Sequence, residues 1–193
     1  TDVGSVKARV VQDVEPILPR FVGSHPLCGS EKTGVAHASA DLFVGAACAV
    51  TPTEQSDAEA VAKVNEFWGA LGGTLINLTA EAHDNIVART SHLPHVVASA
   101  LVNAILGKSH AGESDFIGAG FADTTRLASG SPAMWRDIAL TNAEAIQKAI
   151  NDLQNELGEL KNALAAKDAA ALENFFEEGK TSRDQWLKAD GKK

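Results

Sequence analysis

Tyrosine is absent from the chain, and cysteine is scarce, with two residues in a sequence of 193. The missing tyrosine excludes a tyrosine general acid from any chemistry that the chain performs. The two cysteines, Cys28 and Cys48, lack the spacing of a zinc site, so we expect no metal. One disulfide would be compatible with their number, but two thiols in a chain of this size are more typical of a reduced cytoplasmic protein.

Long apolar runs and an excess of positive charge are also absent. No apolar segment approaches the ~18 residues that a membrane-spanning helix requires, and the N-terminus shows no basic patch followed by the apolar core of a signal peptide. The net charge is −8, and residues 1–78 carry five Lys/Arg against nine Asp/Glu. We therefore expect a cytoplasmic protein that binds neither membranes nor nucleic acid.

Residues 1–78 alternate short apolar runs with amphipathic stretches. The apolar runs predict one strand that ends within residues 1–5, one that ends near His25, and two more over residues 47–51 and 74–78. The apolar spacing in between predicts helices over residues 6–15 and 57–71. Alternating strands and helices favour a parallel or mixed α/β sheet. The strands are too few for a complete doubly wound sheet, so this part resembles the end of one.

Residues 79–193 show helical patterns alone, so we place a domain boundary near Thr79, which is a typical helix N-cap. The long helix after Thr79 is apolar on more than one face, and Pro94 should kink it. A glycine-rich loop at residues 118–120 should lead to Asp123 and Arg126. Further helices are expected from Pro132, along an apolar stripe at residues 146–164, and from Asp168 to Phe176, with a frayed polar tail from Gly179.

Three places in the sequence contain candidates for chemistry: His25, the pair His92 and His95, and Arg126. Pro26 pushes His25 into an extended conformation at a strand end, where a neutral imidazole could accept a proton near pH 7; the alternative is an ordinary surface histidine. His92 and His95 share a helix face, but a zinc site would need a third ligand, so we expect one of them to face a cavity. A lone Arg126 is most often a solvated surface charge.

Three stretches taken together resemble the prephenate dehydrogenase family: Phe21–Gly34, Ser91–His95, and Gly118–Arg126 followed by Ser131–Asp137. The resemblance runs from Asp2 to about Glu178. It implies that residues 1–78 are the C-terminal part of a Rossmann-like nucleotide-binding α/β domain and that residues 79–193 form an all-helical dimerisation and substrate-binding domain. The family opens with a glycine-rich nucleotide-binding turn that this chain lacks, so we expect the chain alone to be inactive.

The resemblance also implies roles for residues. His25 would hydrogen-bond the ring hydroxyl of the substrate, and Ser5 would hold the same hydroxyl beside the cofactor, although the residues alone suggest that Ser5 is a helix cap. His95 would lie in the substrate site, and His92 would have a structural role. Arg126 would bind a substrate carboxylate through its planar fork.

Four more site residues follow from the same resemblance. Asp123 would orient the arginine. Trp135 would lie near the active site of the neighbouring subunit. Ser30 and Glu31, with Lys32, would lie beside the substrate and beside tyrosine bound as an inhibitor; the family has Thr or Ser at the first of these positions, and Ala119 is a mild departure from an all-glycine loop.

The reaction that the resemblance implies is the oxidative decarboxylation of prephenate to 4-hydroxyphenylpyruvate, or of arogenate, with hydride transfer to NAD or NADP in tyrosine biosynthesis. The expected assembly is a homodimer. The alternative is a truncated, non-catalytic homologue that acts as a helical dimerisation module or binds an aromatic effector. The sequence does not decide between prephenate and arogenate as the substrate, or between NAD and NADP as the cofactor.

Overall fold

The computed structural model describes residues 1–29, 34–107 and 113–189, and contacts divide the chain into two compact units, Thr1–Gln147 and Lys148–Lys193. The predicted order of structure is confirmed: strands and helices come first, and helices alone follow. No helix among the described residues is both long enough and apolar enough to cross a membrane.

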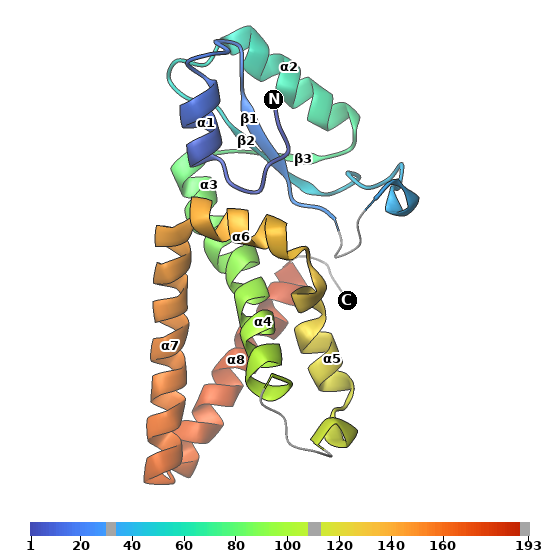
Figure 1. The fold of residues 1–193 in the computed structure, drawn as a ribbon. Helices are drawn as coiled ribbons and strands as arrows, with labels where there is room; N and C mark the ends of the chain where they lie inside the picture. Colours follow the sequence, from blue (N-terminus) through green and yellow to red (C-terminus); the bar gives the residue numbers. More distant parts are fainter. Residues whose placement is uncertain (30–33, 108–112, 190–193) are drawn as a thin grey trace. The chain divides into compact units, whose positions relative to one another are not determined.

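A three-stranded mixed sheet opens the first unit (Figure 1). Its strands are β1 (Gly23–Pro26), β2 (Ala47–Thr51) and β3 (Thr74–Asn77). Strand β2 lies in the middle, antiparallel to β1 and parallel to β3. The predicted strands are thus formed, except at the N-terminus, where residues 1–5 have no strand.

Helix α2 (Ala58–Ala70) packs on one face of the sheet. The carboxylate of Asp57 caps it by accepting the backbone N–H of Ala60, at 2.8 Å. Alternate residues of β2 contribute Cys48 and Val50 to the core under this helix. The rest of this core comes from three buried side chains, Val22, Ala60 and Trp68.

Helix α1 (Ala8–Val14) packs against the start of α3 (Ala80–Val87), where Val11, Phe21 and Ala80 form a second small core. The predicted end of α1 before Pro16 is confirmed. Thr79 caps α3 as predicted, since its hydroxyl accepts the backbone N–H of Ala82 at 3.1 Å.

Helix α3 continues without a break through a π-helical turn, η2 (Ala88–His92), into α4 (Leu93–Ile105). The backbone N–H of Leu93 donates to the carbonyl of Ala88, five residues back, instead of four. Pro94 has no N–H and disfavours helical geometry in the residue before it. The distortion predicted at Pro94 therefore takes the form of a π turn just before it.

A short 3₁₀ turn, η1 (Val35–His37), lies between β1 and β2. The helices that directly follow α4 are short. They are η3 (Glu113–Phe116), α5 (Ala119–Thr125), η4 (Arg126–Ser129) and α6 (Pro132–Thr141). The predicted glycine-rich loop is wrong here, because α5 begins at Ala119 and continues to Thr125. The helix predicted to start at Pro132 is confirmed.

Helix α7 (Ala143–Ala166) runs from the first unit into the second, where α8 (Ala169–Ala189) follows it. Lys167 takes a left-handed conformation between them, with φ of 52°. Asp168 caps α8 as predicted, accepting the N–H groups of Ala170 and Ala171. The predicted frayed tail from Gly179 is wrong: α8 extends to Ala189.

Candidate functional site

A buried lysine fixes the N-terminal segment against β1. The ammonium of Lys7 is fully buried, pairs with the carboxylate of Asp2, and donates to the carbonyl of Ser24 at 2.9 Å. Burial lowers the pKa of Lys7, and the adjacent carboxylate of Asp2 opposes that shift. Asp2 also accepts the backbone N–H of Ser24 at 2.9 Å, so residues 1–7 are held beside the strand that carries His25.

Ser5 lies in this segment and is partly buried. It is not a helix cap, which corrects the interpretation from the residues alone. Helix α1 begins at Ala8, its N-cap residue is Lys7, and no side chain of the N-cap position bonds to the helix. The cap comes from another helix, because Asp84 of α3 accepts the N–H groups of Lys7 and Ala8 at 2.7 and 2.8 Å.

Asp84 also holds the neighbouring histidine. The Nδ1–H of His83 donates to the Asp84 carboxylate at 2.8 Å, and both side chains are buried. Burial alone would raise the pKa of Asp84, but the bonds from His83 and from the two backbone N–H groups hold it below its ordinary value. The carboxylate is therefore ionised near neutral pH.

The other ring nitrogen of His83 reaches the catalytic candidate. Its Nε2 lies 2.9 Å from Nδ1 of His25, and the two rings meet edge to face with centroids 5.1 Å apart. Burial first, and then the neighbouring groups His83 and Lys7, lower the pKa of His25 to about 4. His25 is thus unprotonated at neutral pH, and because it is only partly buried it remains accessible from outside.

The π turn explains how a second buried histidine comes to this region. Nine residues separate His83 from His92, which is roughly 2.5 turns of an unbroken α-helix and would place them on opposite faces. The extra residue of the π turn changes that register, and both side chains are buried, at 2% and 1% exposure. Burial lowers the pKa of His92 to about 4.

His95 stacks on the indole of Trp135, with ring centroids 3.8 Å apart, and its Nδ1–H donates to the carbonyl of Leu127 at 3.1 Å. Burial and the positive charge of nearby Arg126 both lower the pKa of His95, although the bond to Leu127 opposes them. His92 contacts the same indole edge to face, at 6.0 Å. The expectation that His92 and His95 share a face is confirmed.

The structure thus brings four of the eight predicted site residues into two neighbouring clusters. His25 lies in one, and His95, Arg126 and Trp135 form the other. Trp135 stacks on His95 of its own chain. Its predicted place near the active site of the neighbouring subunit stays a prediction. Asp123 is exposed on α5.

Ser30, Glu31 and Lys32 lie outside the described residues, so their predicted roles stay predictions. His92, expected to be structural, has a buried Nε2 with no hydrogen-bond partner among the described residues, as does Nε1 of Trp135. Unpaired buried polar atoms are costly, so a hydrogen bond to either atom would be stabilising.

Sequence reasoning missed His83 and Asp84. Both are polar residues on a helix whose buried positions also include Ala80 and Val87. The available signal was this spacing: His83 and Asp84 fall three and four residues after Ala80, which places all of them on the face that turns inward. Buried ionisable groups of this kind mark functional sites more often than ordinary surface residues do.

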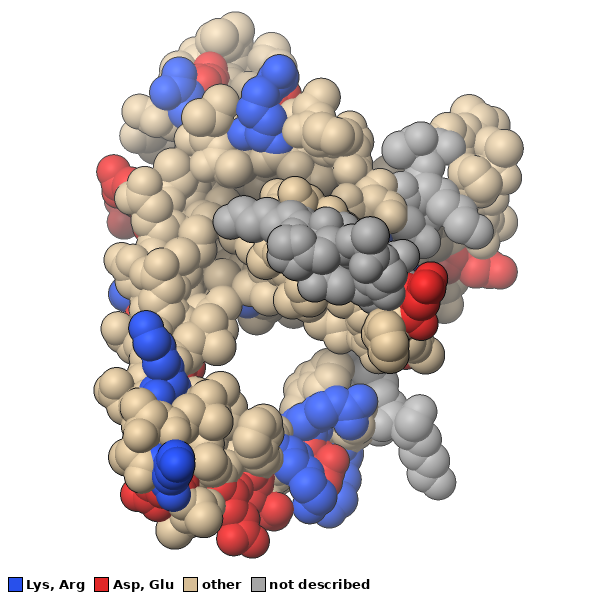
Figure 2. All heavy atoms as spheres, turned by 60° about the horizontal axis from the view of Figure 1, so that its bottom comes forward, with Lys and Arg blue, Asp and Glu red and all other residues tan. Residues whose placement is uncertain are grey.

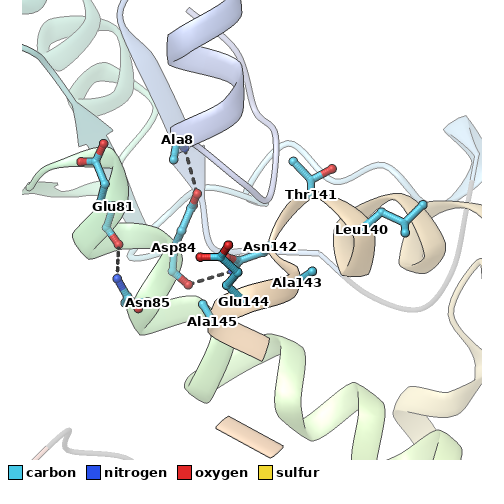
Figure 3. Close-up of a pocket in the computed structure, with 10 residues that line it drawn as sticks. All are labelled: Ala8, Glu81, Asp84, Asn85, Leu140, Thr141, Asn142, Ala143, Glu144 and Ala145. Atoms are coloured by element: carbon cyan, nitrogen blue, oxygen red, sulfur yellow. Dashed lines mark hydrogen bonds between the residues drawn. The ribbon is translucent and has the colours of Figure 1, made fainter. Parts of the chain in front are cut away.

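A shallow hollow of about 370 Å³ lies behind Asp84, between α3 and the start of α7 (Figure 3). Its lining includes three acidic side chains, Glu81, Asp84 and Glu144, and no lysine or arginine. Such a lining repels an anion. The hollow is therefore a poor place for a carboxylate substrate. It is also separate from the histidine clusters, because no histidine lines it.

Charge is otherwise mixed over the surface. On the face that Figure 2 displays, basic side chains stand in small groups, most of them beside acidic ones. Exposed pairs such as Lys63 with Glu59, at 3.0 Å, are part of this pattern. Within the described ranges, no group of three or more His, Cys, Asp or Glu side chains could hold a metal ion.

Comparisons with protein families divide the chain into two matches. Residues 1–77 match the nucleotide-binding domain of prephenate dehydrogenase, and residues 79–178 match its dimerization domain. The first match ends at residue 77, and the second begins at Thr79.

Individual relatives agree with these matches. The prephenate dehydrogenase of Bacillus subtilis is 36% identical and covers 95% of this chain, which spans 51% of that protein. The cyclohexadienyl dehydrogenase of Zymomonas mobilis is 35% identical, over 94% of this chain and 64% of its own length. The crystal structure of Aquifex aeolicus prephenate dehydrogenase with hydroxyphenyl propionate and NAD⁺ superimposes with a TM-score of 0.91, at 37% identity, over 95% of this chain and 65% of that one. The chain thus spans about half to two thirds of these relatives.

Proposed function

Because the chain belongs to the prephenate dehydrogenase family, we propose that it carries the substrate-handling part of a dehydrogenase of tyrosine biosynthesis. The reaction is the oxidative decarboxylation of prephenate or arogenate. Hydride leaves the ring carbon that bears the hydroxyl, the ring carboxylate departs as carbon dioxide, and the ring becomes aromatic. The protein has to orient the hydroxyl and the carboxylate and to accept one proton.

One observation carries this proposal: an unprotonated, accessible imidazole is fixed at a strand end. His25 has a pKa lowered to about 4 and is held through Nδ1 by His83. A proton acceptor must be unprotonated before the reaction, and a fixed ring orientation keeps its free nitrogen aimed at the substrate hydroxyl. Ser5, in the segment that Lys7 anchors beside β1, is proposed to hold the same hydroxyl.

The second cluster suits the carboxylate end of the substrate. Arg126 supplies a permanent positive charge beside His95, whose ring is held by Trp135 and by the Leu127 carbonyl. Guanidinium binds carboxylate through two parallel bonds, which lysine cannot match. Asp123, Ser30 and Glu31 complete the proposed substrate site, with tyrosine as a competing ligand.

The cofactor, NAD or NADP, would supply the hydride acceptor, but this chain does not fit its pyrophosphate. A pyrophosphate needs free N–H groups at a helix that follows a strand. Among the described residues, two helices follow strands in this way, and side chains already occupy their N-termini: Asp57 on α2 and Thr79 on α3. The negative charge of Asp57 would also repel a phosphate.

We therefore expect the 193-residue chain alone to bind the cofactor weakly or not at all and to lack dehydrogenase activity. Calorimetric titration of the chain with NAD and with NADP checks this. Micromolar binding by this chain alone would show that the pyrophosphate site lies within it.

The mutation His25→Asn tests the proposed function in the active dehydrogenase that contains this chain. Turnover should fall by about 10²–10⁴-fold, the usual contribution of a positioned acid–base group, with little change in substrate affinity. The matched control is His37→Asn, because His37 is exposed in η1. Normal turnover of His25→Asn would remove this residue from the reaction and leave the alternative of a non-catalytic, effector-binding homologue.

The proposed domain boundary lies near Thr79, with residues 79–193 forming the interface of a homodimer. The match of residues 79–178 to a dimerization domain supports this assembly. Exposed apolar residues are further support: Ile105 at the end of α4, Leu106 directly after it, and others on the helices of the second unit.

A further inference from the structure

Three ionisable side chains from β1 and α3 form a continuous line of hydrogen bonds. Asp84 contacts Nδ1 of His83 at 2.8 Å, and Nε2 of His83 contacts Nδ1 of His25 at 2.9 Å. Neither family match nor the proposed function assigns a role to His83 or Asp84. We name this line the Asp84–His83–His25 triad.

The donor and the acceptor of each hydrogen bond in the triad can be assigned, starting from the backbone groups that bond to Asp84. The Asp84 carboxylate accepts the N–H groups of Lys7 and Ala8, so it serves as an acceptor and Nδ1 of His83 is the donor. A neutral imidazole has one N–H and one lone pair, so Nε2 of His83 carries the lone pair. The hydrogen bond to it must then come from Nδ1–H of His25, which leaves the lone pair of His25 on Nε2.

We infer that His83 and Asp84 act as a positioning pair, which fixes His25 in the tautomer with a free Nε2 and takes over the proton that His25 accepts. The second part rests on the proposed function of His25. In that step the substrate O–H bond breaks and an Nε2–H bond forms on His25. The Nδ1–H bond of His25 then breaks, an Nε2–H bond forms on His83, and the resulting imidazolium is neutralised by the ionised Asp84.

The surroundings favour this route. His83 is 2% exposed, so it acts on the substrate only through His25, which is partly buried. The other charged or titratable groups that face His25 are Lys7 and Asp2 from the N-terminal segment and His92 from η2. The positive charge of Lys7 opposes a lasting positive charge on His25, whereas His83 contacts a carboxylate. The ring that receives the proton thus faces a carboxylate, whereas the ring that gives it up faces the ammonium of Lys7.

The tautomer is the decisive readout, because a purely structural role of His83 would not determine it. In ¹⁵N spectra of the ring nitrogens of the 193-residue chain, His25 should carry its proton on Nδ1. His83→Phe removes the acceptor and should release His25 to the Nε2–H form. His83→Gln keeps an oxygen acceptor and should retain the Nδ1–H form. An Nε2–H form in the wild type, or an unchanged tautomer in His83→Phe, overturns the inference.

Circular dichroism checks that each variant is folded, and His83→Gln keeps the test decisive if His83→Phe does not fold. In the active dehydrogenase, His83→Phe should lower turnover by roughly 10²–10⁴-fold with an unchanged Michaelis constant, the size of a positioned acid–base contribution. His83→Gln should also reduce turnover, because it cannot take up the proton, while His37→Gln should have no effect.

The two proposals can fail separately. If His25→Asn is impaired and both His83 variants have normal turnover, the positioning pair is wrong and the proposed function stands. If His25→Asn retains normal turnover, the proposed role of His25 is wrong, and with it the proton-transfer part of this inference.

Discussion

The two units of the chain differ in how they place their ionisable groups. The first unit buries ionisable side chains, and three of them, Lys7, His83 and Asp84, are paired. Among residues 148–189 no ionisable side chain is buried and the ion pairs are exposed. Four large apolar side chains are half exposed there, as others are in the first unit: Leu157, Leu164, Phe176 and Trp186.

The difference indicates which interactions stabilise each unit. A buried charge is tolerated only when a partner compensates for its lost hydration, so the first unit depends on specific pairs within one chain. Exposed apolar side chains along two helices, by contrast, gain stability from a further surface that covers them. The exposed apolar side chains of α7 and α8 suit an interface, and residues 148–178 belong to the stretch that matches a dimerization domain.

The largest expected difference between the units comes from matched lysine substitutions. Lys7→Met leaves the Asp2 carboxylate and the Ser24 carbonyl without their buried donor and should cost about 3–5 kcal/mol of unfolding free energy. Lys180→Met removes pairs at 3.6 and 4.0 Å with Glu177 and Asp184 at a side chain that is 66% exposed, and should cost at most about 1 kcal/mol. Denaturant unfolding measures both, and equal losses would show that burial of Lys7 is not decisive.

Acid should destabilise the first unit in particular, because it contains the buried histidines and residues 148–193 contain no histidine. His92 has a folded pKa of about 4 against an ordinary value of 6.5, so the unfolded chain binds more protons between these limits. Stability should fall as the pH drops through this window and level off below it, with a loss approaching about 3 kcal/mol for this residue at 1.36 kcal/mol per unit.

Unfolding free energies at pH 7 and near pH 4.5, for the wild type and for His92→Gln, measure that contribution. The variant cannot gain the proton, so its stability should depend less on pH over the same window. An identical pH dependence in both proteins would show that burial does not hold His92 neutral.

The smallest effect concerns association. Phe176 is 64% exposed on α8, so Phe176→Ser should leave the stability of the isolated chain nearly unchanged. It should weaken self-association by roughly 10-fold or more, because a buried phenylalanine contributes about 1.5–3 kcal/mol. Sedimentation equilibrium measures the change, with Glu177→Ser as the matched control. A wild-type chain that remains monomeric at all concentrations would contradict the proposed homodimer.

Signals confined to a few neighbouring residues were enough to predict much of the fold. Asp168 and Thr79 cap helices as expected, because an N-cap acts on N–H groups three residues away at most. His25 lies in an extended strand, as Pro26 requires. The errors at Gly118–Arg126 and after Gly179 also have a local origin: glycine raises the cost of a helix by only about 1 kcal/mol, which neighbouring residues can offset.

The sequence by itself therefore determined the order of elements after residue 5, the caps at Thr79 and Asp168, and the choice of His25, Arg126 and the two histidines near Pro94 as candidates. The tertiary structure alone decided which of these residues meet. His83 lies 58 positions from His25, and Asp84 caps a helix 76 positions away. Such contacts depend on how α3 packs against α1 and β2. The burial of His92 depends in addition on a π turn that changes the helical register. Packing between distant segments sets that geometry, whereas the periodicity of one segment records only which of its faces turns inward.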